Sequence, residues 1–149
     1  MAVADLWAAN ALWPGQAIVA RLRDQVPELR SVLLVDEFDA SATAPRQLPA
    51  AIVMLDALRV TPAADVYTQP TNCDQDWMVA IAVRSARADA DADSVVVGPL
   101  LPKVVAALQG FEAAAGTRRT FSWRTGPRPS YGKDVSYYPL IFSLQEAMA

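Results

Sequence analysis

The basic residues between positions 118 and 133 have the types and spacing best suited to binding. The segment contains Arg118, Arg119, Arg124, Arg128 and Lys133 and no acidic residue, in a chain with a formal net charge of -3. Arginine and lysine neutralise phosphates, so a nucleic-acid site is one interpretation. A sequence pI of about 4.8 argues against it, because dedicated binders carry a basic footprint over the whole domain. We therefore interpret these five residues as contacts to an acidic surface of another subunit.

Acidic residues at positions 89, 91 and 93 alternate as in the first half of a calcium loop. An EF-hand needs glycine at the sixth position and glutamate at the twelfth, where this chain has Ser94 and Leu100. Carboxylates are also favoured at the N-terminus of a helix. We interpret Asp89, Asp91 and Asp93 as a solvated helix start.

A second acidic group, Asp36, Glu37 and Asp39, follows an apolar strand. Paired carboxylates at a strand end can hold a divalent cation or transfer protons. No lysine or glycine-rich phosphate loop lies nearby in the sequence, so a solvated loop is the favoured interpretation. A carboxylate-based, metal-dependent enzyme stays open as an alternative, as does a nucleic-acid-binding protein.

Most enzyme classes lack their residues in this chain. There is no histidine, which excludes Ser-His-Asp and Cys-His catalysis, and Cys73 is the single cysteine. Cys73 lies in a polar segment whose acidic neighbours disfavour a thiolate, and no GxGxxG, P-loop or GxSxG motif occurs. We therefore predict a protein that is not an enzyme, with no catalytic residue, cofactor or metal.

The length of 149 residues and the hydrophobic content of 53% suit one domain, 1–149, with residues 1–13 as a possible N-terminal arm. No apolar run is long enough to span a membrane, and the N-terminus lacks the basic start of a signal peptide. Hydrophobic periodicity predicts helices at 14–25 and 91–110, and strands at 31–35, 51–58, 76–85, 117–125 and 135–145. The Gly98-Pro99 pair allows either one kinked helix or two short ones.

The expected fold is α+β: one mixed, mostly antiparallel sheet with two main helices packed on it, in the order α-β-β-β-α-β-β. Both faces of the strand at 76–85 are apolar, which predicts a central, covered strand. Pro139 predicts an edge position or a bulge for the last strand. Residues 61–75 and 126–134 are expected to be loops.

Four stretches resemble the tail terminator (minor tail protein U-like) family of long-tailed bacteriophages, over about residues 14–146. They are "LPAAIVMLDALRV", "DWMVAIAVRS", "VGPLLPKVVAALQGF" and the closing "RPSYGKDVSYYPLIFSLQ", a basic Pro/Gly loop followed by an aromatic strand. The resemblance implies a structural protein of the virion tail, assembled in the host cytoplasm. It further implies a homohexameric ring at the head-proximal end, which caps the tail tube, stops its polymerisation and provides the head-joining surface.

The partners that this resemblance implies are other copies of the chain, the tail tube protein and head–tail connector proteins. DNA would pass through the ring with only transient contact, and no membrane is involved. A head–tail joining or tail-completion protein is the alternative within the same assembly.

Overall fold

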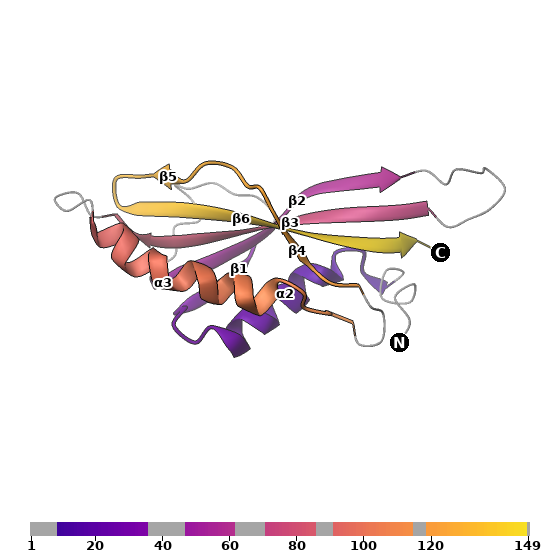
Figure 1. Cartoon of the computed structure of the whole chain (residues 1–149), viewed down its shortest axis with the longest axis horizontal. Coiled ribbons are helices and arrows are strands. Elements are labelled where there is room, and N and C mark those ends of the chain that lie inside the picture. Colours follow the sequence, from indigo (N-terminus) through magenta and orange to yellow (C-terminus); the bar gives the residue numbers. More distant parts are fainter. Residues whose placement is uncertain (1–8, 36–46, 62–70, 86–90, 115–118, 149) are drawn as a thin grey trace.

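The computed structural model describes residues 9–35, 47–61, 71–85, 91–114 and 119–148 (Figure 1). Helices and strands follow in the order α2 Trp13–Gln25, β1 Ser31–Leu34, β2 Ala50–Thr61, β3 Thr71–Arg84, α3 Asp91–Leu108, β4 Ser122–Arg124, β5 Ser130–Tyr131 and β6 Val135–Met148. The predicted order is confirmed, with the two-residue β5 as an addition inside the expected loop.

One six-stranded sheet forms the centre of the molecule. Its strands lie in the order β1-β2-β3-β6-β4, and β5 also pairs with β6. Only the β1–β2 pair is parallel, which confirms the mixed, mostly antiparallel sheet. Both helices lie on one face, here called the helix side, and the far ends of β2, β3 and β6 extend past them (Figure 1). The opposite face is called the open side.

Strand β3 is central, as predicted, because β2 and β6 flank it along its length. Its residues Trp77, Val79 and Ile81 belong to the large core under the helices, together with Phe142 of β6. The intervening Met78, Ala80 and Ala82 belong to a smaller cluster on the open side. Burying one large apolar side chain stabilises a fold by about 1.5–3 kcal/mol, so most of the stabilisation lies on the helix side.

Helix α2 lies directly on the indole of Trp77. Pro14 occupies the first turn, where its missing N–H is not needed, and Ile18 and Leu22 are fully buried one turn apart. A Cβ atom at Gly15 would lie 2.5 Å from Cζ3 of Trp77, so only glycine permits this close approach. The helix ends at Gln25, just before Pro27.

Helix α3 is continuous through the Gly98-Pro99 pair, which resolves the choice between one helix and two. Pro99 and Pro102 both lie inside it and are exposed, so the carbonyls that lose a helical donor face solvent. Arg21 joins the two helices: its Nε donates to the carbonyl of Ala107 at 3.0 Å, and its guanidinium lies 4.6 Å over the ring of Phe111. Gly110, with φ of 76°, ends the helical segment as predicted.

Strand β2 extends to Thr61 and strand β3 begins at Thr71, so the expected loop at 61–75 is wrong for its first residue and its last five. Cys73 therefore lies in a strand and is buried. The apolar period was hidden because Gln75 occupies an inward position there: its amide donates to the carbonyl of Ala11 at 2.6 Å and its oxygen accepts from the indole N–H of Trp77 at 2.9 Å. Residues 1–8 of the possible arm lie outside the described residues.

Two strand predictions near the C-terminus also need correction. Within the described residues the strand expected at 117–125 is only Ser122–Arg124, because Phe121 turns away to pair with Phe111. Strand β6 lies inside the sheet and pairs with β3 without a bulge, not at an edge. Pro139 is accommodated because β5 pairs with β6 before it and β4 after it, which leaves a gap in the outer ladder at the proline.

Candidate interaction surface

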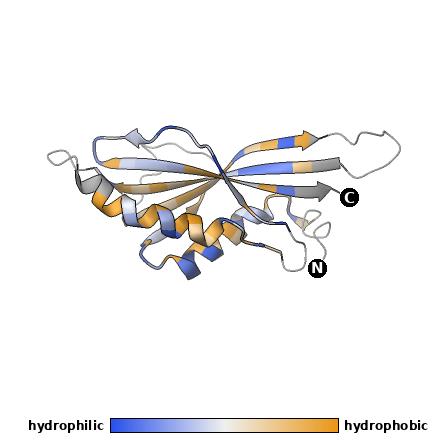
Figure 2. Ribbon diagram, viewed as in Figure 1, coloured by the Kyte–Doolittle hydropathy of each residue, from blue (hydrophilic) through white to orange (hydrophobic). Residues whose placement is uncertain are grey.

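The open side of the sheet is polar toward the far ends of its strands. In the register of β3 with β6, Asp74 lies beside Gln145 and Asp76 beside Ser143. Successive strand residues point to opposite faces, so these four side chains share the open side while their neighbours enter the core. Figure 2 shows hydrophilic residues interrupting the far parts of the long strands.

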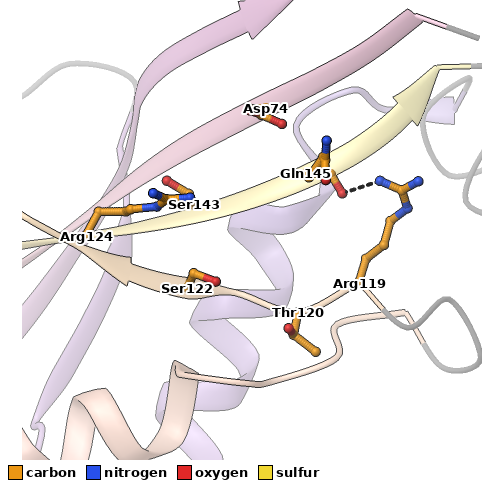
Figure 3. Close-up of a pocket in the computed structure, with 7 residues that line it drawn as sticks. All are labelled: Asp74, Arg119, Thr120, Ser122, Arg124, Ser143 and Gln145. Carbon is orange, nitrogen blue, oxygen red and sulfur yellow. Dashed lines mark hydrogen bonds between the residues drawn. The ribbon is translucent and has the colours of Figure 1, made fainter. Parts of the chain in front are cut away.

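The edge strand β4 adds basic and hydroxyl groups to this polar area. Together they line a hollow of about 580 Å³, formed by Asp74, Arg119, Thr120, Ser122, Arg124, Ser143 and Gln145 (Figure 3). Arg119 is held in place because its Nη1 donates to the backbone carbonyl of Gln145 at 2.7 Å. The register of β4 with β6 places Ser122 and Arg124 on the same face as Ser143.

The charges on this face are only partly compensated. Asp76 accepts a hydrogen bond from the Ser143 hydroxyl and forms an ion pair with Arg59, whose Nη2 atom lies 2.8 Å from the carboxylate. The Oδ1 atom of Asp74 is buried and has no hydrogen-bond partner within the described chain. An unsatisfied buried polar atom costs about 1–3 kcal/mol, and folds tolerate such costs mainly at functional surfaces.

The loop between β4 and β5 crosses the open side. A Cβ at Gly126 would lie 3.1 Å from the carbonyl oxygen of Pro139 and 3.3 Å from Cγ1 of Ile141, so the loop passes closely over β6. Burial raises the pKa of the Tyr137 hydroxyl above its ordinary value of 10.0, so the side chain stays neutral near pH 7. The ring of Tyr131 in β5 packs edge-on against the ring of Tyr138 in β6, with ring centroids 5.9 Å apart.

The structure brings together some of the predicted contact residues. Arg119 and Arg124 line the hollow, Arg128 is exposed on the crossing loop, and Lys133 is exposed in the turn before β6. Arg118 lies outside the described residues. The basic segment thus follows the β4 edge and the loop over the open side.

Most of the predicted acidic residues lie outside the described part of the chain. Asp36, Glu37, Asp39 and Asp89 lie outside the described residues, and α3 begins at Asp91, in agreement with a helix start. Within the described ranges no cluster of three or more histidine, cysteine or acidic residues could hold a metal ion. No described helix is both long and apolar enough to cross a bilayer.

Sequence reasoning missed the acidic floor of the hollow. On the sequence alone Asp74 falls in a loop and Asp76 at the start of a strand, and no role is assigned to Ser143 and Gln145 in the last strand. Their signal was the two-residue spacing of polar side chains in two strands that pair with each other. The sequence of one strand does not show which strand pairs with it, so the polar residues of β3 and β6 could not be assigned to one surface.

Comparison with known proteins gives one family and one fold. The family model described as "Phage tail terminator protein" matches residues 8–149. Among solved structures, a chain from the virion of a native gene transfer agent particle superposes with a TM-score of 0.56, at 17% identity, covering 89% of this chain and 93% of that chain. At that identity the similarity concerns the fold. No curated protein matches the sequence significantly.

Proposed function

Because the chain belongs to the phage tail terminator family, we propose that it closes the finished tail tube as a ring of identical subunits. The family is one of structural proteins of the virion tail, so the role is assembly and not catalysis. The observation that carries the proposal is the match of the family model over residues 8–149. In the proposed ring six copies stop tube polymerisation and offer the surface to which the head joins.

The shape of the sheet supports a head-to-tail ring. Its two edges differ: β1 and the far part of β2 form one, and β4 with the basic loop forms the other. A ring built by rotation needs two different patches on each subunit, whereas a two-fold dimer uses the same patch twice. Arg119, Arg124, Arg128 and Lys133 would then contact a neighbouring subunit or the tube, and Arg118 remains a proposed member of the group.

The proposed partners are copies of this chain, the tail tube protein and the connector proteins toward the head. Exposed charged groups at such contacts act mainly on the rate and register of association. DNA would pass through the ring without sequence-specific contacts.

The first test is the mass and position of the assembled protein. Ring formation predicts particles of about six times the subunit mass of 16.1 kDa, in solution or on tails, and one ring at the head-proximal tail end in electron micrographs. A protein found only in the connector above the tail would instead indicate a head–tail joining role. A protein absent from tails would contradict both.

The second test reverses charge in the basic loop. Arg124→Glu and Arg128→Glu should leave the fold intact, because both side chains are exposed, yet give overlong or headless tails. Arg84→Glu is a matched control, since Arg84 is an exposed arginine at the end of the central strand β3, which forms neither edge of the sheet. Normal particles from both loop variants would show that the basic loop is not a contact.

A further inference from the structure

Large exposed aliphatic side chains gather at one edge of the sheet. Leu12, Leu34, Leu58 and Val60 expose 40%, 44%, 49% and 60% of their surface, and we call this group the aliphatic edge. Exposed apolar residues scattered singly need no explanation, but a contiguous group marks an interaction site.

The members of the aliphatic edge lie on one face and close together. Leu58 pairs in register with Gln75, whose amide binds the carbonyl of Ala11, the residue before Leu12. Leu34 approaches the same place, because its Cδ1 would lie 3.1 Å from a Cβ at Gly15 near the start of α2. The group therefore surrounds the N-terminal end of α2 on the helix side.

Beside this group, no described strand pairs with the outer edge of β2. Strand β1 pairs with β2 only from Ala50 to Val53, and Val35 adds one more bond to Val53. From Leu55 to Thr61, no strand in the described part of the chain covers the outer edge of β2. An unpaired edge with apolar side chains invites association with another chain.

The opposite edge of the same sheet presents a large aromatic side chain. Trp123 of β4 is 53% exposed although it pairs with the fully buried Phe142, so it stands on the helix side at the rim. Its backbone N–H is held by the Oε1 atom of Gln109 at 2.6 Å, which fixes the strand that carries the indole. A tryptophan on a rigid strand is typical of an anchor residue in an interface.

We propose that Trp123 of one copy packs into the aliphatic edge of the next copy, around Leu58. This inference rests on the proposed ring and names the contact that builds it. Trp123 and Leu58 both lie on the helix side, at opposite ends of the strand order, and so belong to two different patches, as a head-to-tail contact requires.

Charge complementarity favours a second copy as the partner. Asp56 is exposed at the bulge of β2 between Leu55 and Ala57, next to the aliphatic edge, and Arg124 is exposed next to Trp123. Neither side chain has a salt bridge within the described chain. When Trp123 docks near Leu58, Arg124 of one copy reaches Asp56 of the next, which fixes orientation more than it adds affinity.

Cysteine cross-linking tests the contact directly, because the native Cys73 is buried and therefore gives little background. Trp123→Cys and Leu58→Cys are made as separate variants, mixed, and oxidised mildly. The mixture should give a covalent dimer at least about tenfold above either variant alone, and a chain carrying both should give a ladder of higher multimers. Val95→Cys, an even more exposed position on α3, mixed with Leu58→Cys is the control.

The outcomes separate this contact from the ring itself. Dimers from Trp123→Cys alone would indicate a two-fold contact and overturn the inference. Rings seen in electron micrographs without cross-linking in the mixture would overturn it while the proposed function stands. Cross-linking without rings on tails would support the contact and contradict the terminator role.

The ion pair has its own test by charge exchange. Asp56→Arg or Arg124→Asp alone should weaken assembly of the purified protein about tenfold or more, and the double exchange should restore most of it. If the double exchange weakened assembly as much as the two single exchanges combined, Asp56 and Arg124 would not be in contact.

Discussion

On the helix side of the sheet Trp77, Phe142 and Leu144 are almost completely buried, while on the open side the alternate residues Asp76 and Ser143 stay polar beside a hollow. The same two strands, β3 and β6, thus supply both surfaces. Alternate residues of each strand point to opposite faces, so one set contributes to stability on the helix side and the other to recognition on the open side. A substitution can therefore affect one without the other if it respects the face.

The largest expected effect is on the helix side. Trp77→Ala should lower the free energy of unfolding by about 3–5 kcal/mol, because it leaves a cavity beneath α2 that the close helix cannot fill. Chemical denaturation followed by circular dichroism measures the loss. Ala82→Ser is the comparison on the open side, at an equally buried but small residue. If it lowered the free energy of unfolding as much as Trp77→Ala does, the two faces would not differ in their contribution to stability.

A smaller effect is expected for Gln75, a buried polar side chain that contacts the backbone at Ala11. Gln75→Met keeps the volume but leaves the indole N–H of Trp77 and the carbonyl of Ala11 without these partners. An unsatisfied buried group costs about 1–3 kcal/mol. If the orphaned indole is the cause, Gln75→Met should cost less in a Trp77→Phe background, and equal costs in both backgrounds would contradict that cause.

The open side should respond more weakly. Asp76→Asn keeps an oxygen for Ser143 and Arg59 but removes the charge, and Arg59 is largely exposed. The loss should be about 0.2–1 kcal/mol, the usual range for an exposed ion pair. It should shrink further in 1 M salt, where screening acts over about 3 Å. A salt-independent loss would mean that packing and not charge is involved.

The fold followed from the sequence where the apolar period was uninterrupted. The strand around Trp77 and Val79 and the helix around Ile18 and Leu22 were predicted close to their observed positions because burial on one or both faces repeats there. The start of β3 was missed because Gln75 occupies a core position. The contacts to Ala11, 64 residues earlier, and to the indole N–H of Trp77 make a polar side chain suitable at that place.

The candidate site was predictable in part for the same physical reason. Arg119 and Arg124 stand out in a local run of basic residues, so composition alone found them. Their acidic counterpart Asp74 reaches the same hollow through the register of β3 with β6, which is a long-range pairing. Trp123 gave no signal as an anchor, because its exposure depends on its place at the edge of the sheet.

The smallest expected effect lies on the outer surface of the helix layer, at the ion pair of Glu28 with Lys103, whose Oε1 and Nζ atoms are 2.7 Å apart. The hydrogen bond from Lys103 lowers the pKa of Glu28 below its ordinary value of 4.5. A lowered folded-state pKa stabilises the protein above the unfolded-state value, and the contribution is lost as the pH falls through the folded-state value.

Glu28→Gln should therefore lower the melting temperature slightly at pH 7 and not at all once the pH is well below 4.5. Exposure of both side chains keeps the difference small, because water and salt screen the pair. Differential scanning calorimetry of both proteins at several pH values measures it, with Asp24→Asn as an exposed carboxylate outside this pair. A difference that persists at low pH would mean that Glu28 stabilises the protein through packing and not through its charge. The outer surface of the helix layer would then contribute to stability as the core does, unlike the open side.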